Sequence, residues 1–329
     1  MDLLLPKGSR EKLPTIVDFS DDRVPRIESM DGVGAKNPYW KRWPELRAET
    51  CRLFLGVGDG AAANVGSRCG GEGRICVTIG TSAAVRVVVK GGEVGKFVVP
   101  KGLWCYRVDG DRLLVGGALT DGGSVVEWLR QLLGLEEDED FEDIMKEVGE
   151  GRGDKGQGTV VPFFSGERST GWRGNATSAM VGITKGAGKA DFVRMNLEGI
   201  SFRLAAIVDL LKSSIGGGMG KGKEILVASG TGLDKNRVWR QMISDSCGMD
   251  MAVLKEGEAT SRGVAMLLSE ALVFEVGGEG NAGSDIKLES LEGLEMHVAR
   301  SEMTVEMKRK RANQEKVIHA LEGAVWEGM

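Results

Sequence analysis

Histidine is almost absent from this 329-residue chain, which contains only His297 and His319. A histidine-based catalytic triad or a histidine-rich metal site is therefore not expected. The five cysteines are odd in number and scattered, without the close pairs that metal sites use. Any acid–base chemistry would consequently have to depend on carboxylates.

Long apolar runs and an excess of positive charge are missing as well. No apolar run approaches the roughly 20 residues of a membrane-spanning helix. The start, Met1–Pro6, is too short and too acidic for a secretory signal. The net charge of −5 gives no general attraction to nucleic acid or to anionic membranes. Because scattered cysteines also suit a reducing compartment, these absences predict a cytoplasmic protein with no nucleic-acid or membrane partner.

Glycine, by contrast, is about twice as frequent as usual, with 50 residues. Much of the excess lies in three patches, at 151–158, 216–222 and 277–283, which we expect to be loops. The second patch superficially suggests a phosphate loop, but no Ser or Thr follows its lysine, and a strand pattern follows it rather than a helix. No Gly-x-Gly-x-x-Gly stretch follows a strand and opens a helix, which argues against a nicotinamide-dependent oxidoreductase.

The most informative stretch of the chain is Gly58–Ser67, in which Asp59 stands between two glycines before a run of small residues. A buried strand is expected at Arg74–Ile79, and the turn Gly80–Ser82 then leads into a second strand at Ala84–Val89. Glycines allow a backbone to approach a ligand closely, and successive turn N–H groups can bind an anion. This layout favours deprotonation of a hydroxyl beside a bound phosphate. The alternative is a carboxylate that caps a helix, followed by an ordinary hairpin.

At these residues the chain resembles a known family. The stretches GVGDGAAANVGSRC and GRICVTIGTSAAVRV are similar to the second half of FGGY-family carbohydrate kinases, closest to the gluconokinase-like branch. The resemblance implies an α/β fold of the ribonuclease H-like (actin-like ATPase) type, with a mixed five-stranded sheet and helices on both faces. It also implies transfer of the γ-phosphate of ATP to a sugar hydroxyl, in a cleft between two such domains.

The resemblance assigns roles to individual residues on the phosphate side of the site. Asp59 would be the general base on the attacking hydroxyl. The γ-phosphate would be held by backbone N–H and hydroxyl donors of Gly80, Thr81 and Ser82. Gly123 matches the start of a helix that approaches the phosphates, where free N–H groups and a positive dipole end would be available. Asp121 is expected to cap that helix, Val125–Leu133.

A second glycine turn matches the family's adenosine-binding turn. The strand Ile225–Ala228 is followed by Ser229-Gly230-Thr231-Gly232 and then by a helix at Lys235–Cys247. The family has two successive glycines here, whereas this chain has Thr231 at the second position, a poor fit if that position requires a positive φ. We expect the adenosine to lie near Gly230 and Thr231, with Asn236 as a weaker candidate.

Two further matches are expected to be structural. In the turn Ser165–Ser169, which resembles the family's GERS sequence, Arg168 is expected to act as a clamp rather than in catalysis. The small residues of Glu258–Ala265 suit tight helix packing. The strongest predicted core helix is Phe192–Leu211, and other expected segments are strands at 103–108, 112–117, 159–164 and 251–254, an acidic solvated helix at 136–150 and a terminal helix at 302–326.

The resemblance begins near residue 13 and places residues 1–50 as a remnant next to the hinge of the first kinase domain, with 51–329 as the C-terminal domain. The family's first domain carries most sugar contacts and would supply most ligands of a Mg²⁺ ion that bridges the ATP phosphates. The substrate that the family implies is a small-molecule sugar. Because the first domain is missing, we expect no turnover by this chain alone. We also expect association with another chain through the exposed cleft face. The alternative is a truncated or non-catalytic actin-like module that binds nucleotide.

Overall fold

The computed structural model describes residues 56–71, 73–90, 98–109, 112–151, 158–215, 224–255, 257–275 and 291–326. The segments predicted within residues 1–50, and most of the three glycine patches, lie outside these ranges. No helix in the described ranges combines the length and the apolar character that crossing a membrane would need.

A mixed seven-stranded sheet has the order β3-β4-β2-β1-β7-β8-β9. Strands β3, β4, β2 and β1 are antiparallel neighbours, β7 and β8 run parallel to β1, and β9 closes the edge antiparallel to β8. The five central strands form the sheet expected for a ribonuclease H-like domain, and β3 and β9 extend it by one strand at each edge. The strands span Arg74–Ile79 (β1), Ala83–Lys90 (β2), Trp104–Arg107 (β3), Arg112–Leu119 (β4), Ile225–Ser229 (β7), Met251–Val253 (β8) and Glu295–His297 (β9).

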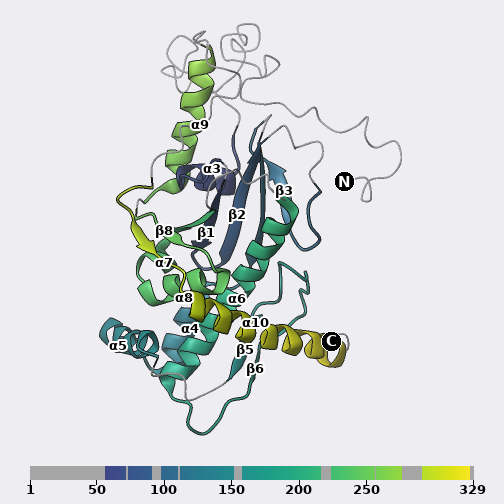
Figure 1. The fold of residues 1–329 in the computed structure, drawn as a ribbon, viewed down its shortest axis with the longest axis vertical. Helices are drawn as coiled ribbons and strands as arrows, with labels where there is room; N and C mark the ends of the chain where they lie inside the picture. The colour runs from purple at the N-terminus through teal and green to yellow at the C-terminus, as the bar shows by residue number, and fades with distance from the viewer. Residues whose placement is uncertain are drawn as a thin grey trace, which may run out of the picture.

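Helices cover both faces of this sheet, as Figure 1 shows. On one side α3 lies against α9, and on the other α6 packs between the sheet and α8. A separate two-stranded sheet, β5-β6, lies beside α6 and α10. The bounds are Asp59–Gly66 (α3), Gly123–Leu133 (α4), Asp138–Gly149 (α5), Thr159–Val161 (β5), Ala179–Val181 (β6), Lys189–Ile215 (α6), Thr231–Asp234 (α7), Arg237–Cys247 (α8), Ala259–Glu275 (α9), Ser301–Leu321 (α10) and Glu322–Trp326 (η5, a π-helix).

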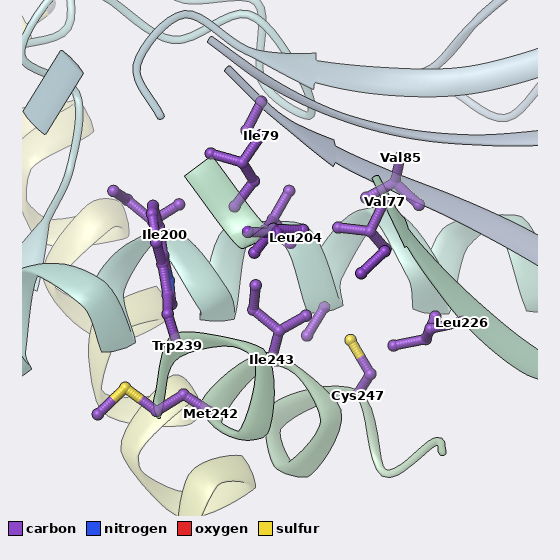
Figure 2. Close-up of a cluster of buried hydrophobic side chains, with 14 of the residues drawn as sticks. Val77, Ile79, Val85, Ile200, Leu204, Leu226, Trp239, Met242, Ile243 and Cys247 are labelled. Carbon is purple, nitrogen blue, oxygen red and sulfur yellow. The ribbon is translucent and has the colours of Figure 1, made fainter. Parts of the chain in front are cut away.

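The main core lies between the sheet and helices α6 and α8. Alternation along β1 turns Ile75, Val77 and Ile79 to this face, because successive side chains of a strand point to opposite sides. Burial of each large apolar side chain contributes about 1.5–3 kcal/mol. Figure 2 shows strand residues directed toward both helices, with Val77, Ile79, Val85, Ile200, Leu204, Leu226, Trp239, Met242, Ile243 and Cys247 labelled.

Helix α6 confirms the predicted core helix and extends it in both directions. The predicted face is buried at Met195, Ile200, Leu204, Ile207 and Leu211. The opposite positions are buried too, since β5, α5, α8 and α10 cover the sides of the helix that face away from the sheet. The sequence pattern showed one apolar face, whereas the helix is enclosed almost all round.

The second face of the sheet is built on an unusually close helix crossing. A Cβ atom on Gly66 of α3 would lie 1.8 Å from the carbonyl oxygen of Ala259, and one on Gly263 of α9 would lie 1.8 Å from that of Ala62. Neither position can carry a side chain unless the helices separate. The tight packing predicted for Glu258–Ala265 is confirmed, and this crossing fixes α3, whose first residue is Asp59.

Candidate functional site

The Gly80–Ser82 turn joins β1 to β2 at the end of the sheet where β7 also ends. Thr81 and Ser82 are exposed, and no other described residue hydrogen-bonds to their hydroxyls. On its other side the turn is held by the segment before α4. The carbonyl of Thr81 accepts from the N–H groups of Gly122 at 2.9 Å and Ser124 at 3.2 Å. The turn is therefore anchored through its carbonyl groups while its hydroxyls face outward.

Gly123 lies directly against this turn. Its N–H donates to the carbonyl of Gly80 at 2.8 Å, and a Cβ atom at Gly123 would lie only 2.6 Å from that oxygen. The expected proximity of Gly123 to the turn is thus present. The expected reason was wrong, because the N–H groups of Gly122, Gly123 and Ser124 bond to the turn and are not available to a phosphate. The absence of a side chain at Gly123 lets two backbones meet.

The predicted cap of helix α4 was also wrong. The N-cap residue is Gly122, which makes no side-chain cap. Asp121 is buried, and its carboxylate accepts from the N–H of Ser165 at 2.8 Å and from the Ser165 hydroxyl at 3.0 Å. Asp121 therefore connects the α4 loop to the turn that resembles GERS.

Within that turn, the clamp is Glu167 and not Arg168. Glu167 is buried, and its carboxylate pairs with Arg203 at 2.9 Å and with Arg173 at 2.6 Å. The side chain of Arg168 is exposed. The prediction chose the right turn but the wrong residue, because a sequence does not show which of two adjacent charges faces α6.

The second glycine turn packs on the same end of β1. Gly230 has φ +95°, and a Cβ atom there would lie 2.8 Å from the carbonyl oxygen of Ile79, the residue before Gly80. A Cβ atom at Gly232 would lie 2.9 Å from the same oxygen. Thr231 does not have a positive φ, because it is already the first residue of α7. The left-handed conformation belongs to Gly230, so threonine is accommodated without strain at the next position.

Just below both turns, two hydroxyls connect β1 to β7. Thr78 and Ser229 are register partners, and their hydroxyl oxygens lie 2.9 Å apart. Cys76 is buried in the same strip, where contact with the Cys69 thiol and the nearby Arg86 guanidinium lower its pKa to about 6 against the opposing effect of burial. This polar strip adds side-chain contacts between the two strands from which the glycine turns emerge.

In the described part of the chain, Asn236 caps a helix. It is the N-cap of α8, where its Oδ1 accepts from the N–H of Trp239 at 3.0 Å. Capping of this kind stabilises a helix by about 1 kcal/mol. The amide nitrogen faces the sulfur of Met145 at 4.0 Å. A contact between Asn236 and adenosine stays a prediction.

Asp59 is the first residue of α3, and its side chain is exposed. One carboxylate oxygen accepts from the N–H of Gly60 at 2.7 Å, and Gly58, not Asp59, is the N-cap. The capping alternative is therefore not what the geometry shows. The carboxylate projects from the first turn of the helix.

Two residues that the sequence reasoning missed meet at this first turn. A Cβ atom at Gly60 would lie 2.5 Å from the hydroxyl oxygen of Tyr106 and 3.7 Å from Nε of Arg86. Tyr106 stacks on Trp104 with ring centroids 5.0 Å apart. Its pKa is raised by burial and by the charge of Asp59, against the opposing charge of Arg86. A detectable signal existed for Arg86, since strand pairing places it opposite Cys76 on the α3 face.

The hydrogen-bond donors of the Arg86 guanidinium are only partly used. Its Nη1 lies 3.4 Å from the hydroxyl of Thr78, and its buried Nε has no hydrogen-bond partner among the described residues. Through Thr78, Arg86 connects the first turn of α3 to the end of β1, two residues before Gly80. A cation therefore lies near Gly60, the residue after Asp59, and contacts the strand that leads into the Gly80–Ser82 turn.

A metal site is not built by these residues alone. In the described ranges, no group of three His, Cys, Asp or Glu side chains could hold a metal ion. The site consists instead of an exposed carboxylate, a cation, hydroxyls and glycine turns, which suits an anionic ligand with several oxygens.

Comparison with known proteins identifies the class of this domain. Residues 76–272 match the model of the FGGY family of carbohydrate kinases, C-terminal domain. The chain belongs to this family, and the matched region holds both glycine turns and the start of α4 but not Asp59.

Individual relatives agree with this assignment. The chain is 25% identical to a gluconokinase of Bacillus licheniformis over 273 residues, which cover 80% of this chain and 48% of that protein. A gluconate kinase structure from Lactobacillus acidophilus superimposes with a TM-score of 0.72 at 22% identity, over 89% of this chain and 56% of the other. The structure of a Plasmodium falciparum glycerol kinase with ADP superimposes with a TM-score of 0.66 at 25% identity, over 82% of this chain and 51% of the other. The chain spans about half the length of the curated relatives it matches.

Proposed function

We propose that this chain forms the nucleotide side of an ATP-dependent carbohydrate kinase that transfers the γ-phosphate to a hydroxyl of a gluconate-like sugar or sugar acid. The observation that carries this proposal is the convergence of three segments on the end of β1. The Gly80–Ser82 turn, Gly123 and Gly230 all lie there, and the backbone of β1 and its turn leaves no room for a side chain at Gly123 or Gly230. Family membership supports the reaction class, and one structural relative was solved with ADP.

In this proposal the phosphates of ATP bind at the exposed Gly80–Ser82 turn. Thr81 and Ser82 donate their hydroxyls, and the anchored turn keeps those donors in place before the nucleotide arrives. Gly123 holds the turn from behind. The adenosine lies against the backbone at Gly230 and Thr231, and the lack of a Cβ atom at Gly230 lets this turn pack closely on the end of β1, beside the phosphate turn.

Asp59 would act as the general base toward the sugar hydroxyl. An exposed carboxylate at a helix start can accept a proton and is already oriented by its bond to the Gly60 N–H. The Arg86 guanidinium, close to this turn, would balance negative charge as a sugar acid and a phosphate come together. Mg²⁺ would neutralise the ATP phosphates, but the described residues do not supply its ligand set, so its ligands would come from the nucleotide and from elsewhere.

The test is calorimetric binding of magnesium-ATP to the 329-residue protein. Thr81→Ala removes one exposed hydroxyl and should weaken binding by about tenfold to a hundredfold, the size expected for a hydrogen bond to a charged group. Thr184→Ala is a matched control, because Thr184 is an exposed threonine in the loop between β6 and α6. Equal affinities for wild type and Thr81→Ala would remove Thr81 from the site, and no binding by wild type would contradict the nucleotide role.

A further inference from the structure

Arg240 on α8 is a buried cation, 4% exposed, that holds the short helix α7. Its Nη1 donates to the carbonyl of Leu233 at 2.5 Å and to that of Asp234 at 2.9 Å. The N–H groups of the same two residues return to the carbonyl of Gly230, at 3.0 and 3.2 Å. Leu233 and Asp234 therefore join Arg240 directly to the glycine turn, and a guanidinium at final helix carbonyls is a favourable arrangement.

The other side of the guanidinium is held by strand β9. Its Nε donates to Nε2 of His297 at 3.0 Å, and its Nη2 pairs with Glu295 at 2.8 Å. His297 is buried, and its Nδ1 lies 3.2 Å from Oε1 of Gln241. Because Arg240 can only donate, Nε2 of His297 accepts, and its proton is on Nδ1, directed at Gln241. All three nitrogens of the guanidinium are thus occupied.

We propose that Arg240 is a positioning residue for the adenosine turn, and that strand β9 contributes to nucleotide affinity through it. The inference rests on the proposed function, in which adenosine lies at Gly230 and Thr231. Strand β9 lies outside residues 76–272, the region that the family model matches. An edge strand with no side chain in the site would then help to set how tightly the nucleotide is held.

The physical reason is preorganisation. Helix α7 has only four residues, too few to be stable by itself, so its conformation depends on tertiary contacts. Gly230 can adopt many backbone conformations, and ordering it only when nucleotide binds would lower the affinity. Arg240 fixes both carbonyl groups that follow the turn and is itself fixed by β9. The ordering is therefore completed during folding, before ligand binding.

A purely structural role for Arg240 predicts something different. In that case its loss would lower stability without affecting the adenosine portion of the ligand selectively. Arg300 offers a matched control, because its guanidinium pairs with buried Asp245, another residue of α8, at 2.6 Å. Its bonds reach α8 only, and none of them reaches α7.

The experiment compares wild type, Arg240→Gln and Arg300→Gln of the 329-residue protein with two ligands, magnesium-ADP and magnesium-pyrophosphate. Pyrophosphate lacks the adenosine. We expect Arg240→Gln to weaken ADP binding on the order of tenfold and pyrophosphate binding less than twofold, whereas Arg300→Gln leaves both within twofold. If Arg240→Gln lost affinity equally for ADP and pyrophosphate, or if the two variants lost ADP affinity equally, the proposal would be overturned.

Amide hydrogen exchange on the ligand-free proteins provides a readout that does not need nucleotide. The amides of Leu233, Asp234 and Asn236, which close the α7 turn, should exchange faster in Arg240→Gln than in Arg300→Gln at matched global stability. Unchanged protection of these amides would contradict the positioning role. If wild type bound no ADP, the nucleotide function would fail, while the exchange result would still decide whether Arg240 orders the turn.

Discussion

The N–H of Gly123 donates to the carbonyl of Gly80 at 2.8 Å, and this contact joins the start of α4 to the turn between β1 and β2. It uses a helix-start N–H that could otherwise have faced a phosphate. What remains for a ligand is the outward side of the turn, with the hydroxyls of Thr81 and Ser82. The α4 N-terminus therefore supports the proposed phosphate site from behind.

Gly123→Ala should disrupt this contact. The new Cβ atom would lie 2.6 Å from the Gly80 carbonyl oxygen, a backbone atom that cannot rotate away. We expect a loss of unfolding free energy of about 1–3 kcal/mol, as for other overpacked sites, together with weaker magnesium-ATP binding. Urea unfolding and calorimetry measure the two effects. Gly174→Ala, at an exposed glycine with open space around its Cβ position, should leave both unchanged.

Gly263→Ala should be more damaging to stability. Its Cβ atom would lie 1.8 Å from the carbonyl oxygen of Ala62, so α9 and α3 would have to separate. We expect a loss of at least about 3 kcal/mol in the free energy of unfolding. Gly323→Ala is the control, a helical glycine with nothing near its Cβ position, where alanine should be neutral or slightly stabilising. Similar unfolding midpoints for both variants would show that the helix crossing can relax.

Asp59→Asn tests the proposed general base. In an enzyme that joins this chain to a first domain of the family, we expect phosphorylation to fall by about 10²–10⁴-fold with little change in ATP affinity. Asparagine has nearly the same shape but cannot accept the proton. Asp140→Asn is a matched control, since Asp140 is an exposed carboxylate in the first turn of α5. Near wild-type turnover by Asp59→Asn would leave the carboxylate without a catalytic role.

The pH dependence of stability should reflect His297. Burial and the charges of Arg240 and Arg237 lower its pKa, against the opposing influence of Glu295. A base whose folded pKa lies below the unfolded value of about 6.5 contributes stability that is fully present above that pH and is lost as the pH falls from there through the folded pKa. Urea midpoints of wild type should decrease between about pH 7.5 and 5.5, and those of His297→Gln should decrease less. Parallel curves would contradict this assignment.

Glu295 contributes in a separate, lower window. Its hydrogen bond with Lys255, followed by that with Arg240, lowers its pKa to about 2 despite an opposing effect of burial. The carboxylate therefore stabilises the fold above its ordinary pKa of about 4.3, and that contribution is lost as the pH falls toward 2. A Glu295→Gln variant should lose this acidic contribution, and because it also removes the charge that raises the pKa of His297, its decrease in stability below about pH 6.5 should be larger than that of wild type.

Much of the architecture could be predicted because local patterns agree with the fold. The strand at Arg74–Ile79 was predicted with its observed bounds, and the crossing at Gly263 followed from a run of small residues. Strand β9 was missed because residues 275–300 show no apolar period and its pairing with β8 is long-range. Arg86 could be noticed as a charge within an apolar strand, but its position beside Gly60 depends on β2 and α3 meeting in three dimensions.

The sequence predicted three glycines that the structure places close together, but it did not predict how they bond, and their role in binding nucleotide stays a prediction. Gly80, Gly123 and Gly230 were identified by resemblance, and the structure brings them together at the end of β1. The wrong roles of Asp121 and Arg168 share one cause. A side chain next to a turn can bond locally or reach a distant loop, and only the tertiary contact with Ser165 or α6 decides which.

The most direct test of the account is to map ADP binding on the isotope-labelled 329-residue protein by NMR chemical-shift changes in the presence of magnesium. We predict that the largest shifts cluster on the amides of Gly80–Ser82, Gly123 and Gly230–Thr231, which meet at one end of β1. Smaller shifts should follow α7 toward Arg240. Saturable shifts that cluster elsewhere, or no shifts at millimolar ADP, would contradict the assignment of this end of the sheet as the nucleotide site.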